Sequence, residues 1–398
     1  MRDGVGDVYY GFARDTFTFQ TPRVMLGWGA LRDLGELATK QGLNKVVVVT
    51  DEGLVRAGLL DQLEEVLRGA DVNVLGVFDS VEPEPSVATV KKASELLREM
   101  RPDGVIGFGG GSCLDAAKAA SVAAVHEAPI EDQLGMDKVP GPGLTKILVP
   151  TTAGTSSEIT QVAVLTDKDG NKRVMYSGFL LAELALVDPE LTVGLPPRQT
   201  AGTGLDTLVH AIESYVSVLR NPISDLCAER AIRLIAANLR TAVLKGRHSP
   251  EARYNMSLAA TIAGFAFANS SVAAVHAISL PFGTKYKVAH GEANAVVLPH
   301  VMCYCAPADV ARYADVARWL GVSDEGRSIE ELALASADAA ERLVRDCGFE
   351  PRLSAYGVDR EDFSGFADVA LEVQSHNLER NPRDLDREDL LRIYEAAL

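Results

Sequence analysis

The sequence has few cysteines, and none of them forms a CxxC pair. Five cysteines occur among 398 residues, an odd and small number that is unlike a disulfide framework or a cysteine zinc site. Unpaired thiols are typical of a reducing compartment, so we predict a cytoplasmic protein. The first residues also lack the basic start and apolar run of a secretion signal, which agrees with this prediction.

Long apolar runs and an excess of positive charge are lacking too. Nowhere do 18 apolar residues follow one another, so no membrane-spanning helix is predicted. Lys and Arg total 39 against 55 Asp and Glu, which gives a formal charge of −16. Such a charge repels phosphate backbones and anionic lipid headgroups. We therefore expect neither nucleic acid nor a membrane as a partner.

What the sequence does contain is enough apolar material for a sizeable core. Hydrophobic residues make up 47% of the chain and charged residues 24%, with only 18 prolines, a composition unlike that of a disordered chain. The length is between two and three times that of a typical domain of about 150 residues. We expect a folded protein with two domains.

The first half alternates short strand-like runs with helical patterns. The strand-like runs are nearly continuous in apolar residues, which is typical of a parallel sheet covered by helices on both faces. The expected strands and helices are strands 45–50, 72–78, 105–108 and 147–149, and helices 52–68, 87–100 and 114–125.

The pattern changes after Leu195-Pro-Pro197, where strand-like runs become rare and helical periodicity continues. We place a domain boundary near Pro196, between an α/β domain of residues 1–195 and an all-helical domain of residues 196–398. The fold class expected is a Rossmann-like parallel-sheet domain followed by an all-α domain. The expected C-terminal helices are 205–218, 225–239, 257–267, 308–320 and 329–346.

A glycine-rich turn follows the strand expected at 105–108. It reads Gly107-Phe-Gly109-Gly110-Gly111-Ser112 and opens a helix. Glycines in this context let backbone amides approach an anion, and the helix N-terminus adds a partial positive charge. Ser112 stands where the dinucleotide fingerprint has its third glycine. Taken alone, the motif fits both a phosphate site and a tight strand-to-helix turn.

Two other strand ends carry polar residues. Asp51 follows the strand 45–50, where an acidic group can accept from ribose hydroxyls and repel a 2′-phosphate, although an aspartate there is also typical of a helix N-cap. Residues 150–158, Pro-Thr-Thr-Ala-Gly-Thr-Ser-Ser-Glu, are rich in hydroxyls and small side chains. This segment could surround phosphate oxygens or a nicotinamide, or be a plain loop.

Four residues of the helical half suggest a metal site. Asp206 and His210 are four apart, so they project from one helical face, and their neighbours are apolar. A buried carboxylate and imidazole need partners, which a divalent cation would provide. His276 and His290 are also flanked by small or apolar residues. Each histidine alone could be a core or capping residue, but the four together favour an N/O site for iron, zinc or another transition metal.

Further motifs follow one another in a fixed order. They are 19–27, 109–118, 150–158, 187–189, 195–197, 204–213, 276–283, 290–291 and 381–383. Over nearly the whole chain this series resembles the iron-containing, group III alcohol dehydrogenase family, whose architecture is also that of dehydroquinate synthase. The resemblance implies a Rossmann-like N-terminal domain, a helical C-terminal domain, a cleft between them and at least a homodimer.

The resemblance also implies roles for individual residues. The implied metal ligands are Asp206, His210, His276 and His290. The implied NAD contacts are Asp51, Gly109, Gly110, Gly111, Ser112, Asp115, Thr151, Thr152 and Lys172. The implied cofactors are NAD and a divalent metal, with Fe2+ favoured and Zn2+ as the alternative.

These residues predict an NAD-dependent oxidoreductase of the iron-type alcohol dehydrogenase class. In such an enzyme NAD accepts a hydride from the carbinol carbon, while a bound cation acts as a Lewis acid on the alcohol oxygen. The expected substrate is a small primary alcohol or aldehyde, or a hydroxy acid. Alternatives are a zinc polyol dehydrogenase of the glycerol type, a hydroxyacid-oxoacid transhydrogenase, and a non-catalytic nucleotide-binding protein. Leu280 replaces a second histidine of many family members, which leaves the substrate open.

Overall fold

The computed structural model describes residues 16–398, which form two compact units. One unit is Thr21–Gly194, and the other is Leu195–Leu398 together with residues 16–20. Those five residues and Leu195, assigned by sequence to the first domain, thus group with the second. The predicted absence of a secretion signal falls largely on residues 1–15, outside the described part. No helix within residues 16–398 is long and apolar enough to cross a membrane.

The first unit is built around a six-stranded sheet in which every pair of neighbouring strands is parallel. The strands follow the order β1-β9-β6-β4-β2-β3. Their apolar runs explain their position, since β4 is buried along its whole length. The parallel sheet expected from the sequence is confirmed. The strands are β1 (Arg23–Leu26), β2 (Lys45–Val49), β3 (Asn73–Phe78), β4 (Gly104–Gly109), β6 (Thr145–Pro150) and β9 (Leu184–Val187).

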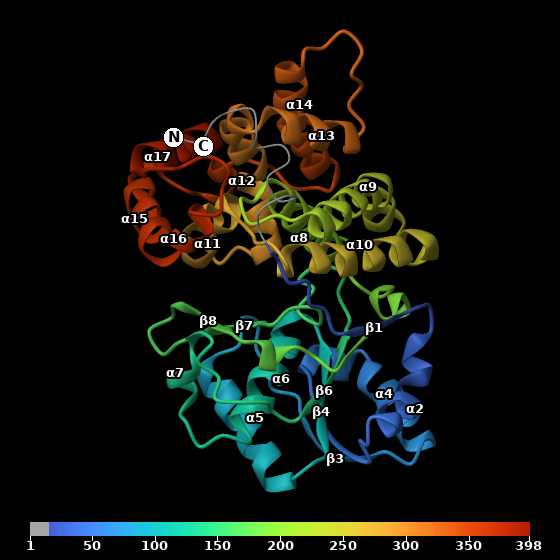
Figure 1. Cartoon of the computed structure of the whole chain (residues 1–398). Coiled ribbons are helices and arrows are strands. Elements are labelled where there is room, and N and C mark those ends of the chain that lie inside the picture. The colour runs from blue at the N-terminus through green and yellow to red at the C-terminus, as the bar shows by residue number, and fades with distance from the viewer. Residues whose placement is uncertain (1–15) are drawn as a thin grey trace. The chain divides into compact units, whose positions relative to one another are not determined.

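Helices cover both faces of this sheet (Figure 1). Val46 and Val48 of β2 pack toward α2 and α4, whereas Val47 and Val49 pack toward α5 and α6, because successive side chains of a strand point to opposite faces. The helices are α2 (Leu34–Lys40), α3 (Glu52–Arg56), α4 (Leu59–Gly69), α5 (Val87–Met100), α6 (Gly111–Ala123) and α7 (Ile130–Gln133).

Two features of this unit differ from the expectation. The single helix expected at 52–68 is two helices, because Gly58 adopts a left-handed backbone conformation with φ of 70° before α4. A second sheet of three strands in the order β5-β8-β7 was not expected. Its strands are β5 (Gly135–Met136), β7 (Val162–Thr166) and β8 (Lys172–Tyr176).

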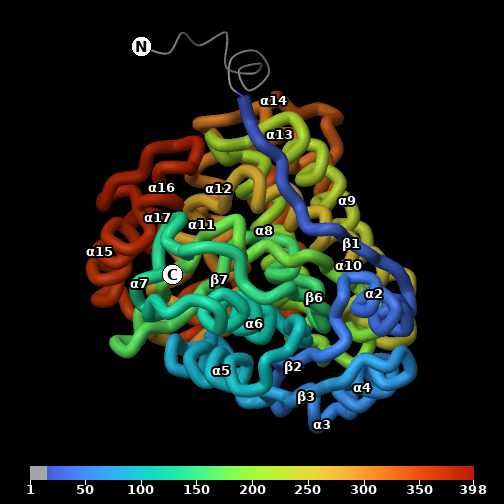
Figure 2. Tube along the Cα trace, turned by 60° about the horizontal axis from the view of Figure 1, so that its bottom comes forward, coloured from blue at the N-terminus to red at the C-terminus, as the bar shows by residue number. Residues whose placement is uncertain are grey.

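Among its described residues the second unit contains helices and loops but no strand, as the sequence predicts. Residues 204–216 of α8 are all buried, so this helix forms the centre of the unit. Helices α11 and α12 lie beside α8 (Figures 1 and 2). The helices are α8 (Pro197–Val216), α9 (Pro222–Lys245), α10 (Pro250–Ala268), α11 (Ala274–Tyr286), α12 (His290–Cys305), α13 (Val310–Trp319), α14 (Ile329–Asp346), α15 (Phe363–Val373), α16 (Ser375–Leu378) and α17 (Arg387–Ala397).

The sequence pattern did not predict α11 and α12. Both are apolar on nearly every side, and each contains an internal proline, Pro281 in α11 and Pro299 in α12. A helix without a polar face has no clear 3.6-residue period, and proline normally argues against a helix interior. These two helices carry two of the candidate metal ligands.

Candidate metal centre and cofactor-binding edge

Three helices bring the four candidate metal ligands together. Asp206 and His210 project from one face of α8, His276 lies in the first turn of α11, and His290 is the first residue of α12. The side chains of Asp206 and His210 are buried, whereas that of His290 is 48% exposed. The group is therefore enclosed by the helices and open to solvent at His290.

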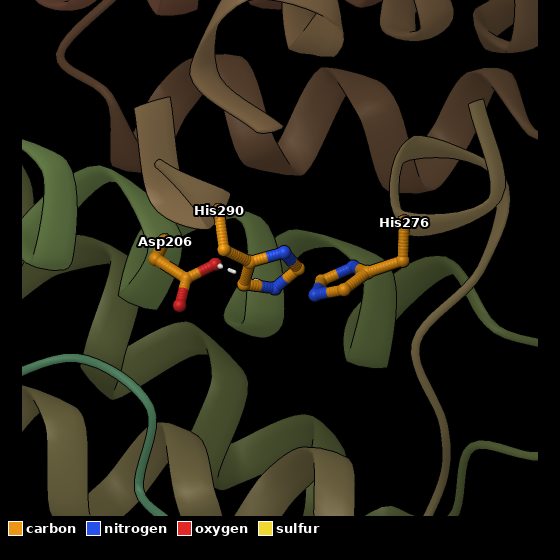
Figure 3. Close-up of side chains that lie close together, drawn as sticks. All are labelled: Asp206, His276 and His290. Atoms are coloured by element: carbon orange, nitrogen blue, oxygen red, sulfur yellow. Dashed lines mark ion pairs between the residues drawn. The ribbon is translucent and has the colours of Figure 1, made fainter. Parts of the chain in front are cut away.

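The ligand atoms of these side chains converge. One such atom from each of Asp206, His276 and His290 lies within 4.8 Å of the other two. Figure 3 shows the His290 ring between the Asp206 carboxylate and the His276 ring, and His290 Nε2 is 3.7 Å from Asp206 Oδ1. His210 Nε2 is 3.9 Å from the same oxygen, and the His210 and His276 rings stack with centroids 5.0 Å apart. The structure thus gathers all four residues that the sequence singles out.

The electrostatics suit a cation. Burial lowers the pKa of His210 to about 4, and the nearby Asp206 carboxylate offsets this only in part. His210 is therefore neutral at neutral pH, as a metal-binding imidazole must be. Its Nδ1 is buried without a hydrogen-bond partner among residues 16–398. One carboxylate and three imidazoles form a donor set that iron or zinc accepts, so the residues present fit such an ion.

Two polar residues beside the ligands were not singled out by sequence reasoning. Glu213 lies seven residues after Asp206 on α8; its Oε2 is 2.5 Å from His276 Nδ1, and its Oε1 accepts from the Val275 backbone N–H. Burial acts to lower the pKa of His276, but the charge and hydrogen bond of Glu213, together with the charge of Asp206, outweigh burial and raise this pKa. Asn294 of α12 contacts Asp206. The helical spacing from Asp206 could have indicated Glu213, but contacts between helices have no signal in one sequence.

Most of the candidate NAD residues gather at one edge of the six-stranded sheet. Asp51 follows β2, Gly109 ends β4, and Thr151 follows β6. These three strands are neighbours and parallel, so their carboxyl ends share an edge. In the sheet, β3 lies on one side of β2 and β4 lies on its other side, so the direction in which successive strands are added reverses after β3. Ligands of open α/β sheets bind at such a reversal of strand order.

Two of the glycines at the turn from β4 to α6, Gly109 and Gly111, are required by the local geometry. Gly109 has φ of 152°, which other residues rarely adopt, and a Cβ there would lie 2.6 Å from Cys113 Sγ. A Cβ on Gly111 would lie 2.8 Å from the Thr155 side chain. Gly110 precedes α6 and gives it no side-chain cap. The first N–H groups of a helix without a cap are available to an anion.

Asp51, Thr151 and Thr152 lie against neighbouring segments at this edge. Asp51 Oδ1 accepts from the Leu54 N–H at 3.1 Å, so the N-cap that the sequence left as an alternative is present. Its Oδ2 accepts from the Cys113 thiol at 3.3 Å. The Thr151 N–H donates to the Gly109 carbonyl at 2.9 Å, and the Thr152 side chain would be the nearest neighbour of a Cβ on Gly110.

The other candidate NAD residues are engaged within the protein. Asp115 Oδ1 accepts from Ser157 Oγ and pairs with the buried Lys118, and Oδ2 accepts from the Val164 N–H. These contacts favour a structural role for Asp115. Ser112 and Lys172, the remaining two candidates, both contact Glu84. Ser112 Oγ accepts from the Glu84 backbone N–H at 3.2 Å, and Lys172 forms an ion pair with the Glu84 carboxylate at 2.5 Å.

Comparisons with known proteins agree over nearly the whole chain. The profile described as "Iron-containing alcohol dehydrogenase" matches residues 21–189, and "Fe-containing alcohol dehydrogenase family, C-terminal" matches residues 200–398. Long-chain-alcohol dehydrogenase 1 of Geobacillus thermodenitrificans is 42% identical over 379 residues, which is 94% of this chain and 95% of that protein.

Two solved structures are similar to this chain in their backbone. The structure of 1,3-propanediol oxidoreductase has a TM-score of 0.93 at 36% identity and covers 96% of this chain and 100% of its own. Sulfoacetaldehyde reductase from Bifidobacterium kashiwanohense, in complex with NAD+, has a TM-score of 0.88 at 31% identity and covers 96% of this chain and 99% of its own.

Proposed function

The chain belongs to the iron-containing alcohol dehydrogenase family, and from this premise we propose what its site residues do. The predicted fold class, family and enzyme class are confirmed: the protein is an oxidoreductase that acts with NAD(H) on small alcohols or aldehydes. Iron is the metal of the family. The roles of individual residues, the substrate and the native metal are proposals.

We propose that Asp206, His210, His276 and His290 hold Fe2+. The observation that carries this proposal is the convergence of ligand atoms of Asp206, His276 and His290, from three helices, within 4.8 Å. His210 joins them because its Nε2 is 3.9 Å from Asp206 Oδ1. A bound ion would supply a Lewis acid to the oxygen of an alcohol or aldehyde. The residues supply the rest: Asp206 contributes a negative charge, neutral His210 a nitrogen lone pair, and the exposed face at His290 an approach from solvent.

We propose that NAD binds at the sheet edge of the first unit. The backbone N–H groups at the start of α6, around Gly110 and Gly111, would face the pyrophosphate. Asp51 would accept from ribose hydroxyls, and Thr151 with Thr152 would border the cofactor. Asp115 would act indirectly, through the contacts by which it holds Ser157 and Val164. For Lys172 to contact NAD, its ion pair with Glu84 must open.

The two units have different roles in these assignments. We propose that the α/β unit is the NAD-binding domain and that the helical unit is the metal and substrate domain, so turnover requires both. The substrate would be a small primary alcohol or aldehyde, or a hydroxy acid. Leu280, partly buried, lies one turn after His276 on α11, in the place that the resemblance gives to a second histidine. An apolar side chain there favours alcohols with an apolar chain.

The test is anaerobic reconstitution of the purified protein with Fe2+ or Zn2+, followed by NADH formation over a panel of primary alcohols, diols, glycerol and hydroxy acids. We expect NADH with Fe2+ and primary alcohols, and none with His210→Ala. Glycerol oxidation with Zn2+ would support the polyol alternative. Oxidation of a hydroxy acid only when an oxoacid is added, without free NADH, would support the transhydrogenase. NAD binding without any metal-dependent turnover would support the non-catalytic alternative.

Two further proposals concern the protein in its cell. We place it in the cytoplasm, because all five cysteines are free thiols, as expected in a reducing compartment. We also propose a homodimer or a larger homo-oligomer, as the family resemblance implies. Cell fractionation, with alkylation of free thiols during lysis, tests the location. Multi-angle light scattering of the purified protein tests the oligomeric state.

A further inference from the structure

Asn294 is a fully buried side chain that contacts three of the proposed metal ligands. It lies on α12, one turn after His290. Its Nδ2 is 2.8 Å from Asp206 Oδ1, 3.2 Å from His290 Nε2 and 3.3 Å from His276 Nε2. An amide nitrogen can only donate, so the shortest of these contacts is a hydrogen bond from Asn294 to the Asp206 carboxylate.

A second buried side chain decides which end of the Asn294 amide faces the ligands. The Ser279 hydroxyl, on α11, donates to Asn294 Oδ1. A longer contact of 3.4 Å joins the same hydroxyl to the His276 carbonyl. Because an amide oxygen can only accept, the hydroxyl holds this oxygen away from Asp206 and the amide nitrogen toward it. The chain Ser279–Asn294–Asp206 thus connects α11, α12 and α8.

We propose that Ser279 and Asn294 are positioning residues that orient the Asp206 carboxylate for the metal. The inference rests on the proposed function of Asp206 as a ligand. A buried carboxylate with a fixed hydrogen-bond donor is held in one orientation, and such outer partners of metal ligands typically contribute about 10- to 100-fold to metal affinity. Neither residue touches the substrate or the cofactor in this assignment, so their loss should weaken the metal site first.

The test measures metal binding directly, with Co2+ as the probe. The full-length protein is stripped of metal, and the dissociation constant for Co2+ is determined by competition with a chelator, together with the visible absorption of the bound ion, which reports its coordination. We expect Asn294→Leu, which has a similar shape and no donor, to bind Co2+ about 10- to 100-fold more weakly and with an altered spectrum. Ser279→Ala should change both in the same direction, and by less.

Two variants control this experiment. Ser279→Thr keeps a hydroxyl and should restore native binding. Ser336→Ala removes an equally buried serine hydroxyl, which donates to the Ala333 carbonyl within α14 and touches none of the proposed ligands. It should leave the Co2+ affinity and spectrum unchanged. If Asn294→Leu does not fold, the comparison of Ser279→Ala with Ser279→Thr decides the question.

The outcomes separate this proposal from the proposed function. Native Co2+ affinity and spectrum in a folded Asn294→Leu or Ser279→Ala protein would show that the pair only packs, and the proposal would be wrong. If His276→Ala also bound Co2+ with native affinity, the error would lie in the metal site itself. Weak binding in Ser336→Ala equal to that in Ser279→Ala would likewise overturn the proposal, because loss of any buried hydroxyl would then suffice.

Discussion

The proposed sites of the two units are built from different parts of the amino acids, side chains in one and backbone in the other. In the helical unit the proposed site consists of side chains, and Asp206, His276 and His290 each contact a further buried polar side chain, Asn294 or Glu213. In the α/β unit the site consists mainly of backbone, at the carboxyl ends of three neighbouring strands, where Gly109 and Gly111 leave no room for a Cβ. A cation needs specific donor atoms, whereas a pyrophosphate needs N–H groups and space.

This difference predicts which substitutions each site tolerates. The helical site should fail when a side chain is removed, and the sheet edge when a side chain is added. Because the proposed ligands all lie in the unit Leu195–Leu398 and the glycines in Thr21–Gly194, damage to one site should leave binding at the other intact.

The largest effect is expected from removal of a metal ligand. His210→Ala, His276→Ala and His290→Ala should each lose the metal and lower kcat/KM by more than about a thousandfold, because Lewis-acid stabilisation contributes several kcal/mol. NAD binding should not change. The checks are the metal content per protein, NADH formation and a fluorescence titration with NAD. A variant with full metal content and near-native turnover would show that its histidine is not a ligand.

The next largest effect is expected from a side chain added at the sheet edge. A Cβ on Gly110 has its nearest neighbour, Thr152, at 3.6 Å, which is ordinary contact, so Gly110→Ala should fold normally. The methyl group would instead obstruct the pyrophosphate and weaken NAD binding by about 10- to 100-fold, or about 1.4 to 2.8 kcal/mol. Metal content should be native.

Gly69→Ala is the matched control for this experiment. Gly69 ends α4, and a Cβ there has nothing within 4 Å. Its NAD affinity should equal that of the native protein. If Gly110→Ala also binds NAD normally, then phosphate does not approach the start of α6, and the proposed cofactor position is wrong.

A smaller effect is expected on the choice between NAD and NADP. Asp51→Asn keeps an oxygen that can accept from the Leu54 N–H and so preserves the helix cap, but it removes the charge that would face a 2′-phosphate. Two like charges about 4 Å apart repel by as much as about 4 kcal/mol near a protein surface, before screening by salt. We expect kcat/KM with NADP to rise by about tenfold or more relative to NAD. If the ratio of kcat/KM with NADP to that with NAD does not change, Asp51 does not face the adenosine ribose of the cofactor.

An effect of a different kind, on the pH dependence of stability, is expected in the α/β unit. Burial raises the pKa of Glu158 to about 7, against the opposing effects of its backbone hydrogen bond and Lys118. Between its unfolded value of about 4.5 and about 7, the folded protein keeps a proton that the unfolded chain has lost, so stability falls as pH rises. Glu158→Gln lacks this ionisation. Relative to native protein, its stability should therefore increase between these pH values, by up to about 3 kcal/mol.

Thermal unfolding of both proteins from pH 5 to 8 measures this difference. Their melting temperatures should diverge in favour of Glu158→Gln as pH rises, and the divergence should level off above about pH 7. A constant offset at every pH would mean that Glu158 has an ordinary pKa. The NAD affinity of Glu158→Gln shows in addition whether the loop after β6, which contains residue 158, keeps its conformation.

The sequence predicted those features that depend on neighbours along the chain. Apolar runs placed four of the six strands of the parallel sheet, β2, β3, β4 and β6, but not β1 and β9. The four-residue spacing of Asp206 and His210 placed both on one face of α8. The helix break at Gly58 was missed, because a left-handed glycine interrupts two segments that share one amphipathic pattern. The positions of α11 and α12 were missed because small apolar residues and internal prolines conceal their period.

By itself the sequence determined which chemistry is available: a carboxylate and three imidazoles in an apolar setting, and glycines after a buried strand. Only the tertiary structure decided which groups orient them. Glu213 behind His276, Asn294 against Asp206, and Asp115 turned toward Ser157 and Val164 are contacts between elements far apart along the chain. Helical spacing and strand alternation fix the direction of a side chain only within its own element. The partner it meets depends on how the elements pack.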